Sequence, residues 1–120
     1  MMVDSGLFIL STWKPIECGF TGYKSQATSW GSWTDEQFAN KGMLWAYWRN
    51  GDIGTIVINT HMSDETRHKE YMQLNELAIL IGGLKEKYMG CTKGLEVYVV
   101  GDFNVDYNDP HSLTLFEKKN

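Results

Sequence analysis

Four runs of apolar residues along the chain predict β-strands. They cover residues 7–12, 43–48, 54–60 and 95–100, and the first is expected to be a buried strand. Residues 50–52, between the second and third runs, read Asn-Gly-Asp, which is a tight-turn signal. We therefore expect the second and third strands to form a hairpin.

One long helix is predicted over residues 65–88. Apolar side chains recur there every three or four residues and form a single stripe, made of Leu74, Leu77, Ala78, Ile81, Leu84 and Tyr88. Gly82 and Gly83 lie inside this pattern, and each costs about 1 kcal/mol relative to alanine in a helix, so a kink or an early end is expected there. Gly90 is a suitable stop signal.

The remaining segments predict less regular structure. Residues 13–33 are expected to form a long loop or an irregular hairpin, because a proline and several glycines interrupt them. Residues 34–37 are expected to form one short helical turn, with Thr34 near capping-box spacing from a glutamate. Asp109-Pro110 resembles the cap and first residue of a final helix.

Together these elements predict an α/β (α+β) fold, with a mixed β-sheet and packed helices. A long helix between two strands allows them to be parallel neighbours, so the strands at 54–60 and 95–100 should lie side by side. Their ends would then bring His61 and Asp102 to the same edge of the sheet. A chain of 120 residues has room for one modest core, which favours a single domain over residues 1–120.

Composition and charge narrow the functional classes. Apolar residues make up 42% of the chain and the net charge is −4, so the chain is globular in composition and carries no strong basic footprint for nucleic acid or anionic membrane. No apolar run reaches the roughly 20 residues of a membrane-spanning helix, and no signal peptide is visible. Cys18 and Cys91 are expected to be unpaired thiols rather than a disulfide, which leaves the compartment open.

Polar residues follow two of the predicted strands. His61 comes at the end of one strand, and Asp102 and Asn104 come at the end of the last one. Strand ends in α/β proteins are places where ligand sites collect. A carboxylate beside an amide can hold a hard cation or its bound water, and a histidine can donate to a phosphate oxygen.

A series of short motifs also occurs in order across nearly the whole chain. They are Asp4-Ser5-Gly6-Leu7, Leu10-Ser11, Pro15-Ile16, Ala39-Asn40-Lys41-Gly42, Asn59-Thr60-His61-Met62, Arg67, Gln73 and Gly101-Asp102-Phe103-Asn104. With these motifs the sequence resembles the endonuclease/exonuclease/phosphatase superfamily, which has the deoxyribonuclease-I-like sandwich fold. Within that superfamily it is most similar to the neutral sphingomyelinase-type phosphodiesterases.

The resemblance implies a metal-dependent phosphoesterase and a role for each matched residue. His61 would contact the scissile phosphate, and Asp102 would orient or activate the attacking water and contact the metal. Asn104 would hold phosphate or metal-bound water, and Lys41 would bind substrate at the edge of the site. The implied cofactor is a divalent cation, usually Mg²⁺, with Asp102 and Asn104 as its contacts in this chain.

Two parts of the family's site are missing from the sequence. The family's metal-binding glutamate precedes the Asp-Ser-Gly-Leu motif, where only three residues stand before Asp4, and no terminal Ser-Asp-His motif follows Asn104. We therefore expect a partial, truncated domain that is inactive alone. A nuclease, an inositol-polyphosphate phosphatase and a non-catalytic remnant or binding fragment are the alternatives.

The implied partner is a phosphodiester substrate, either a phospholipid headgroup or a nucleic acid. Five aromatic residues lie in the predicted loop over residues 13–33, namely Trp13, Phe20, Tyr23, Trp30 and Trp33. They are expected either to pack the loop onto the sheet or to form an aromatic patch that contacts a membrane surface. No obligate protein partner is evident from the sequence.

Overall fold

The computed structural model of the chain describes residues 6–24, 41–62 and 67–103, and for residues 67–70 it describes the backbone alone. Several sequence predictions lie outside these residues. They concern the helical turn at residues 34–37, the final helix beginning at Asp109, the candidate site residue Asn104, and Trp30 and Trp33 of the aromatic group.

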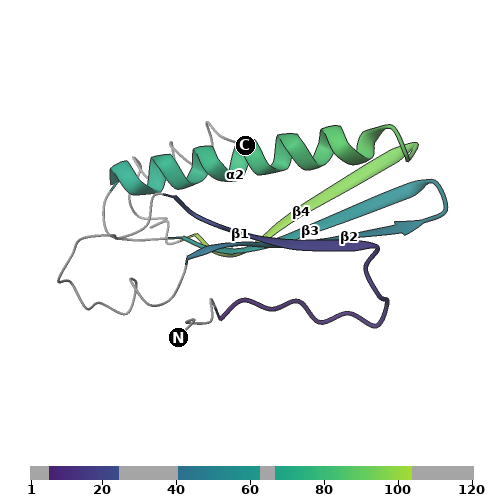
Figure 1. Ribbon diagram of the computed structural model, residues 1–120, viewed down its shortest axis with the longest axis horizontal. Coiled ribbons are helices and arrows are strands. Elements are labelled where there is room, and N and C mark those ends of the chain that lie inside the picture. The colour runs from purple at the N-terminus through teal and green to yellow at the C-terminus, as the bar shows by residue number, and fades with distance from the viewer. Residues whose placement is uncertain (1–5, 25–40, 63–66, 104–120) are drawn as a thin grey trace.

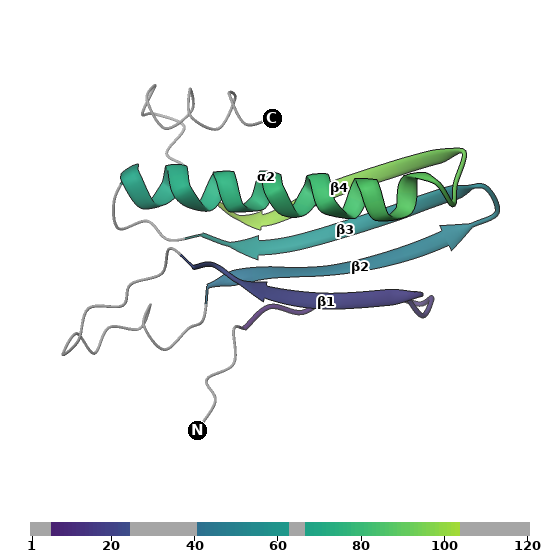
Figure 2. The same cartoon turned by 45° about the horizontal axis from the view of Figure 1, so that its top comes forward.

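A four-stranded mixed sheet forms the centre of the described structure (Figures 1 and 2). Its strands lie in the order β1 (Glu17–Gly22), β2 (Gly42–Asn50), β3 (Ile53–His61) and β4 (Gly94–Asp102). The first three strands are antiparallel to one another, whereas β4 is parallel to β3. Helix α2 (Arg67–Met89) connects β3 to β4 and covers one face of the sheet. The predicted α/β class, a mixed sheet with a packed helix, is confirmed.

The predicted hairpin is formed by β2 and β3. Their pairing runs from Met43 opposite Thr60 to Asn50 opposite Ile53. Gly51, in the turn, has a φ of 61°, a left-handed conformation that glycine adopts without a steric cost. The turn chemistry of residues 50–52 therefore fixes the register that carries Thr60 and His61 to the far end of the sheet.

Helix α2 runs without interruption for 23 residues. The early end expected at Gly82 and Gly83 is wrong, because the helix continues past both and ends at Met89, just before Gly90 as predicted. Buried residues on either side of the two glycines, Leu77 and Leu84, anchor the helix to the core. Tertiary packing of this kind outweighs the weak helix propensity of two exposed glycines.

The hydrophobic core lies between the sheet and α2. Its most buried members are Tyr23, Met43, Tyr47, Ile56, Ile58, Met62, Leu74, Leu77, Leu84 and Tyr88. The predicted helix stripe is confirmed at Leu74, Leu77, Leu84 and Tyr88, whereas Ala78 and Ile81 are only partly buried. Val97 and Val99 of β4 are also partly buried and pack against the same core. The rings of Tyr47 and Tyr88 stack with their centroids 3.7 Å apart and join the sheet to the C-terminal half of the helix.

Side chains of β3 alternate between the two faces of the sheet. Ile56, Ile58 and Thr60 are fully buried beneath α2, so Asn59 and His61 lie on the other side. We call this other side the helix-distal face. The N-terminal segment, drawn in purple in Figure 1, runs along it on the opposite side of the sheet from α2.

The strand predicted at residues 7–12 is wrong. The segment forms no strand, and Phe8 and Leu10 are 68% and 87% exposed. It reaches the sheet through a side chain, because Asn59 Nδ2 donates to Phe8 O at 3.0 Å. Both edges of β2 and of β3 are already paired in the sheet, so a segment that lies across their face cannot add to the ladder.

Strand β1 is a regular strand that the sequence did not predict, since it falls within the segment expected to be a long loop or an irregular hairpin. Gly19 is in the strand because of close packing rather than a turn, as an added Cβ would lie 2.8 Å from the ring of Trp45. Gly42 in the partner strand β2 is similar, because an added Cβ there would lie 2.6 Å from the ring of Phe20. Glycine inside a strand often marks such a close approach.

Two further expectations concern thiols and membrane spans. Cys18 and Cys91 are both free and exposed. Among the helices of residues 6–24, 41–62 and 67–103, none is long and apolar enough to cross a membrane.

Candidate functional site

The C-terminal ends of the parallel strands β3 and β4 meet at one edge of the sheet, as predicted. His61 is paired with Asp102, and the Met62 N–H donates to Asp102 O at 2.9 Å just beyond the last pair. Paired residues of neighbouring strands point to the same side of a sheet. Both side chains therefore lie on the helix-distal face, away from α2.

Lys41, immediately before β2, completes this group. Its Nζ lies 3.1 Å from Nε2 and 3.2 Å from Nδ1 of His61. Nε2 of His61 lies 3.6 Å from Oδ2 of Asp102. We call Lys41, His61 and Asp102 the rim cluster. The side chains of His61 and Asp102 are 35% and 65% exposed, so a ligand can reach both from solvent.

The rim cluster combines a cation, an imidazole and an anion. A lysine ammonium can only donate, so its hydrogen bond to His61 needs the ring nitrogen that carries a lone pair. The similar distances from Nζ to the two ring nitrogens let either one accept. At 3.6 Å, His61 and Asp102 are within ion-pair range but are too far apart for a hydrogen bond. Lys41 and His61 are thus two adjacent donors suited to an oxyanion.

Gly101 explains how β4 can bring Asp102 to this edge. Its φ of 132° is one that other residues rarely adopt, and an added Cβ would overlap the backbone oxygen of Thr60 in β3. The backbones of the two strands therefore approach closely just before the rim cluster. Gly101 is therefore required by the close packing of the two backbones, and Asp102 beside it contributes a carboxylate to the rim cluster.

The rim cluster does not by itself form a magnesium site. Across the described part of the chain, no three His, Cys, Asp or Glu side chains are grouped so that they could hold a metal ion. Asp102 is the one carboxylate of the cluster, with His61 beside it and the Lys41 ammonium beyond. Magnesium needs oxygen ligands in octahedral geometry, so these donors do not fit the ion, and Asn104 lies outside the described residues.

For Tyr23, one of the five aromatic residues of the predicted loop, the expected packing onto the sheet is confirmed. Its side chain is 2% exposed and lies in the core behind the rim cluster. Trp13 and Phe20 of the same group are 75% and 46% exposed. No sequence signal separated these cases, because β1, which carries the chain into the core at Tyr23, was not predicted.

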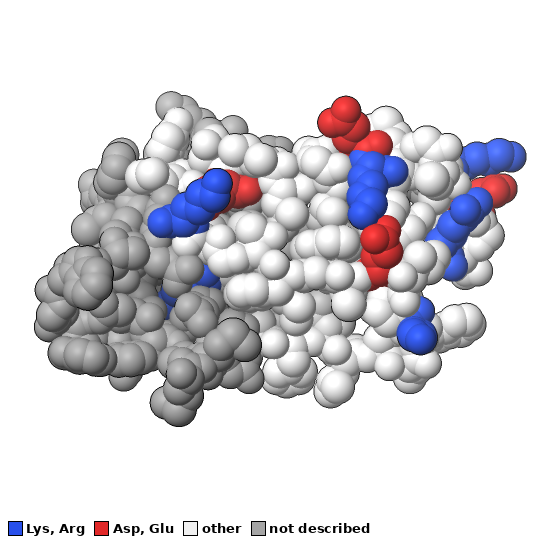
Figure 3. All heavy atoms as spheres, viewed as in Figure 1, with Lys and Arg blue, Asp and Glu red and all other residues white. Residues whose placement is uncertain are grey.

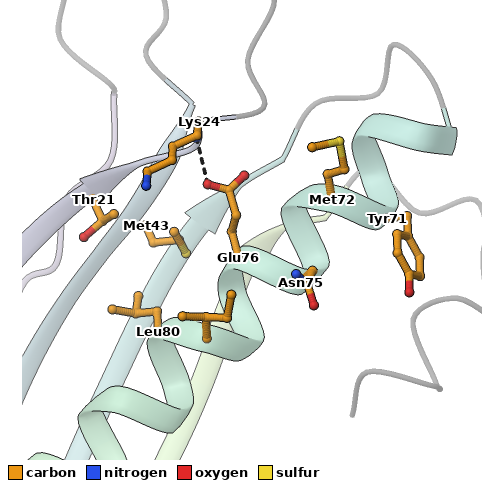
Figure 4. Close-up of a pocket in the computed structure, with 9 residues that line it drawn as sticks. Thr21, Lys24, Met43, Tyr71, Met72, Asn75, Glu76 and Leu80 are labelled. Atoms are coloured by element: carbon orange, nitrogen blue, oxygen red, sulfur yellow. Dashed lines mark hydrogen bonds between the residues drawn. The ribbon is translucent and has the colours of Figure 1, made fainter.

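Two cavities lie away from the rim cluster. One, of about 460 Å³, opens between β1 and α2, and Figure 4 shows the residues that line it, including Lys24 and Glu76. The Lys24 N–H donates to Glu76 Oε1 at 2.8 Å and joins the end of β1 to the helix. The other, of about 470 Å³, lies between the N-terminal segment and the helix-distal face, and Trp13 and Trp48 both line it.

No protein-family model, curated protein or solved structure matches this chain. Within residues 6–24, 41–62 and 67–103, the fold is of the α/β class, with a four-stranded mixed sheet and a helix that connects its two parallel strands.

Proposed function

We propose that this chain supplies the middle part of a Mg²⁺-dependent phosphoesterase domain of the endonuclease/exonuclease/phosphatase superfamily. The domain would hydrolyse a phosphodiester by metal-assisted attack of water, as the sphingomyelinase-type enzymes do. The chain alone would be inactive, because the family's metal-binding glutamate and its Ser-Asp-His motif are not among its 120 residues.

One observation carries this proposal. Lys41, His61 and Asp102 come from three different motifs of the resemblance, yet Nζ of Lys41 lies 3.1 Å from Nε2 of His61, and the same Nε2 lies 3.6 Å from Oδ2 of Asp102. Strands β3 and β4 hold His61 and Asp102 side by side, and α2, which connects these strands, lies on the opposite face of the sheet from the two side chains.

Each residue of the rim cluster has a definite part in the proposed chemistry. The Lys41 ammonium offsets the single negative charge of a phosphodiester, and His61 donates to an oxygen whose charge grows in the transition state. Asp102 orients the attacking water by accepting a hydrogen bond from it. Bound Mg²⁺ would supply further charge stabilisation at phosphorus, through ligands that the described residues do not provide.

A phospholipid headgroup is the substrate class that we favour over nucleic acid. Four large apolar side chains of the N-terminal segment, Phe8, Leu10, Trp13 and Ile16, are 58–87% exposed, which suits a lipid surface. On the face seen in Figure 3, basic and acidic side chains of the described residues are interspersed and form no extended basic patch. Proteins that bind nucleic acid usually present an extended basic patch of this kind.

The experiment starts from the DNA on both sides of this reading frame. If it codes for a glutamate-bearing strand upstream and Ser-Asp-His downstream, the longer product should hydrolyse sphingomyelin or bis(p-nitrophenyl) phosphate with Mg²⁺. His61→Ala and Asp102→Asn should each lower kcat by about 10²-fold or more, whereas Lys93→Met, on the exposed turn before β4, should not. Flanking DNA without either motif, or activity that His61→Ala leaves intact, would contradict the proposal and favour a non-catalytic fragment.

A further inference from the structure

A chain of buried hydrogen bonds lies directly behind the rim cluster. The hydroxyl of Thr60 donates to Gly42 O at 2.8 Å, since a carbonyl can only accept. The Thr60 oxygen lies 2.5 Å from the Tyr23 hydroxyl. Because the single proton of Thr60 is used for Gly42, the Tyr23 hydroxyl must donate to Thr60. The order of donation therefore runs from Tyr23 to Thr60 to Gly42.

Burial makes this chain of bonds strong. Tyr23 and Thr60 are 2% and 0% exposed, so water does not compete for either hydroxyl. Burial is also the main reason why the pKa of Tyr23 lies well above its usual 10.0, which keeps the hydroxyl protonated and able to donate.

The bonds connect the two backbone segments that carry Lys41 and His61. The β2–β3 ladder ends at the pair of Met43 and Thr60, so it does not determine where Lys41 lies relative to His61. Tyr23 supplies the missing connection in two ways. Its N–H donates to Lys41 O at 2.9 Å, and its hydroxyl acts through Thr60 on the neighbouring Gly42.

The far side of Tyr23 is also held. The N–H of Lys24, the next residue, donates to Glu76 of α2 at 2.8 Å, as the dashed line in Figure 4 shows. Tyr23 therefore lies between α2 and the two backbone segments that carry Lys41 and His61.

We propose that Tyr23 is a positioning residue for the rim cluster, which through Thr60 sets the contact between the Lys41 ammonium and the His61 ring. The significance of this contact for phosphate chemistry rests on the proposed function, but the positioning itself can be measured without any ligand.

The test uses NMR of the isotope-labelled 120-residue chain and two readouts. The first is the set of His61 ring ¹H and ¹⁵N resonances in the ligand-free protein, and the second is the dissociation constant of dimethyl phosphate. Tyr23→Phe and Thr60→Val should shift the His61 ring resonances and weaken dimethyl phosphate binding about fivefold, the factor that one net hydrogen bond provides. Thr60→Ser keeps the hydroxyl and should retain both readouts.

Tyr47→Phe is the matched control, because Tyr47 is equally buried but its hydroxyl has no hydrogen-bond partner among the described residues. A purely structural role for Tyr23 would lower the melting temperature but leave the His61 resonances of the folded protein unchanged. Folded Tyr23→Phe and Thr60→Val variants with the same His61 resonances as Tyr47→Phe would overturn the inference.

Two further outcomes are separable. If dimethyl phosphate fails to bind the wild type while the His61 resonances respond to Tyr23→Phe, the proposed function fails and the positioning role stands. If both variants unfold, the wild type decides, since the Tyr23 hydroxyl proton should exchange slowly with water and give its own resonance. Fast exchange of that proton would overturn the inference.

Discussion

At the scale of single residues, side chains distant in the sequence fix the edges of the sheet to the helix. Glu17 at the start of β1 accepts hydrogen bonds from Tyr88 at 2.5 Å and from Lys87 at 3.1 Å, both in the last turn of α2. These bonds, the Tyr88 one foremost, lower the pKa of Glu17 below its usual 4.5. The ionised form of Glu17 is therefore the one that the folded state prefers.

This preference predicts a pH-dependent stability. Because the pKa of Glu17 is lower in the folded than in the unfolded state, its contribution is present above about pH 4.5 and is lost as the pH falls through the lowered value. The melting temperature of Glu17→Gln should lie below that of the wild type at pH 6, and the gap should narrow toward pH 3. Glu86→Gln, which changes an exposed residue in the last turns of α2, is the control. A gap that stays constant over this range would contradict the assignment.

Two buried tyrosines allow a matched comparison. The Tyr23 hydroxyl donates to Thr60, whereas the Tyr47 hydroxyl is buried with no hydrogen-bond partner among the described residues. Tyr23→Phe should lower the free energy of unfolding by about 1 kcal/mol, and Tyr47→Phe should leave it unchanged or raise it. Urea denaturation measures both, and equal losses in the two variants would show that the hydroxyl of Tyr23 contributes nothing specific.

At the scale of elements, α2 and β4 position the rim cluster more than any loop does. The helix supplies the crossover that makes β3 and β4 parallel, and its buried stripe holds it to the sheet. Gly82 and Gly83 lie on the exposed side of this helix, and an added Cβ at either one meets no atom within 4 Å.

Alanine at these glycines should therefore stabilise the protein. Gly82→Ala and Gly83→Ala should each raise the free energy of unfolding by about 0.5–1 kcal/mol, because alanine loses less backbone entropy in a helix. Gly101→Ala is the opposite case, since its positive φ and the Thr60 backbone leave no room for a Cβ. Chemical denaturation should show a higher free energy of unfolding for Gly82→Ala and Gly83→Ala and a lower one for Gly101→Ala. Destabilisation by Gly82→Ala would show that α2 is not regular at that point.

The sequence allowed prediction of those elements whose signals are local. Periodicity identified α2, the Asn-Gly-Asp turn identified the hairpin of β2 and β3, and the crossover then placed His61 beside Asp102. The predictions that failed concern segments whose structure depends on residues distant in the sequence. Residues 7–12 have the composition of a strand but lie across a face whose strands are already paired, and the glycines of β1 resemble turn signals until Trp45 is seen packed over one of them.

At the scale of the whole molecule, the sheet is covered by α2 on one face. The rim cluster lies at the end of the other face, where the His61 and Asp102 side chains are partly exposed. The described residues offer two adjacent donors for a phosphate and one carboxylate for a water. They do not offer a metal site. Under the proposed function, this chain would therefore contribute to phosphate binding without providing the complete catalytic site.

The purified 120-residue chain should accordingly show almost no Mg²⁺-dependent phosphodiesterase activity. General acid–base catalysis is typically worth about 10²–10⁴-fold, and the Ser-Asp-His motif and the metal-binding glutamate that the proposed function requires are not among the 120 residues. Hydrolysis of sphingomyelin and of bis(p-nitrophenyl) phosphate, with and without EDTA, measures this. Robust turnover that EDTA abolishes would show that the chain contains a complete site.

Titration of the labelled chain with dimethyl phosphate, followed at the His61 ring resonances, measures directly whether the rim cluster binds phosphate. We expect saturable shifts at His61 and smaller shifts at Asp102. Lys41→Met should weaken the binding by about tenfold, as expected when an ion-paired donor is lost. Lys93→Met, which removes an exposed lysine far from the rim cluster, should leave the titration unchanged. A wild-type chain whose His61 resonances do not respond, or a Lys41→Met variant that binds as the wild type does, would contradict the assignment of the rim cluster as a phosphate site.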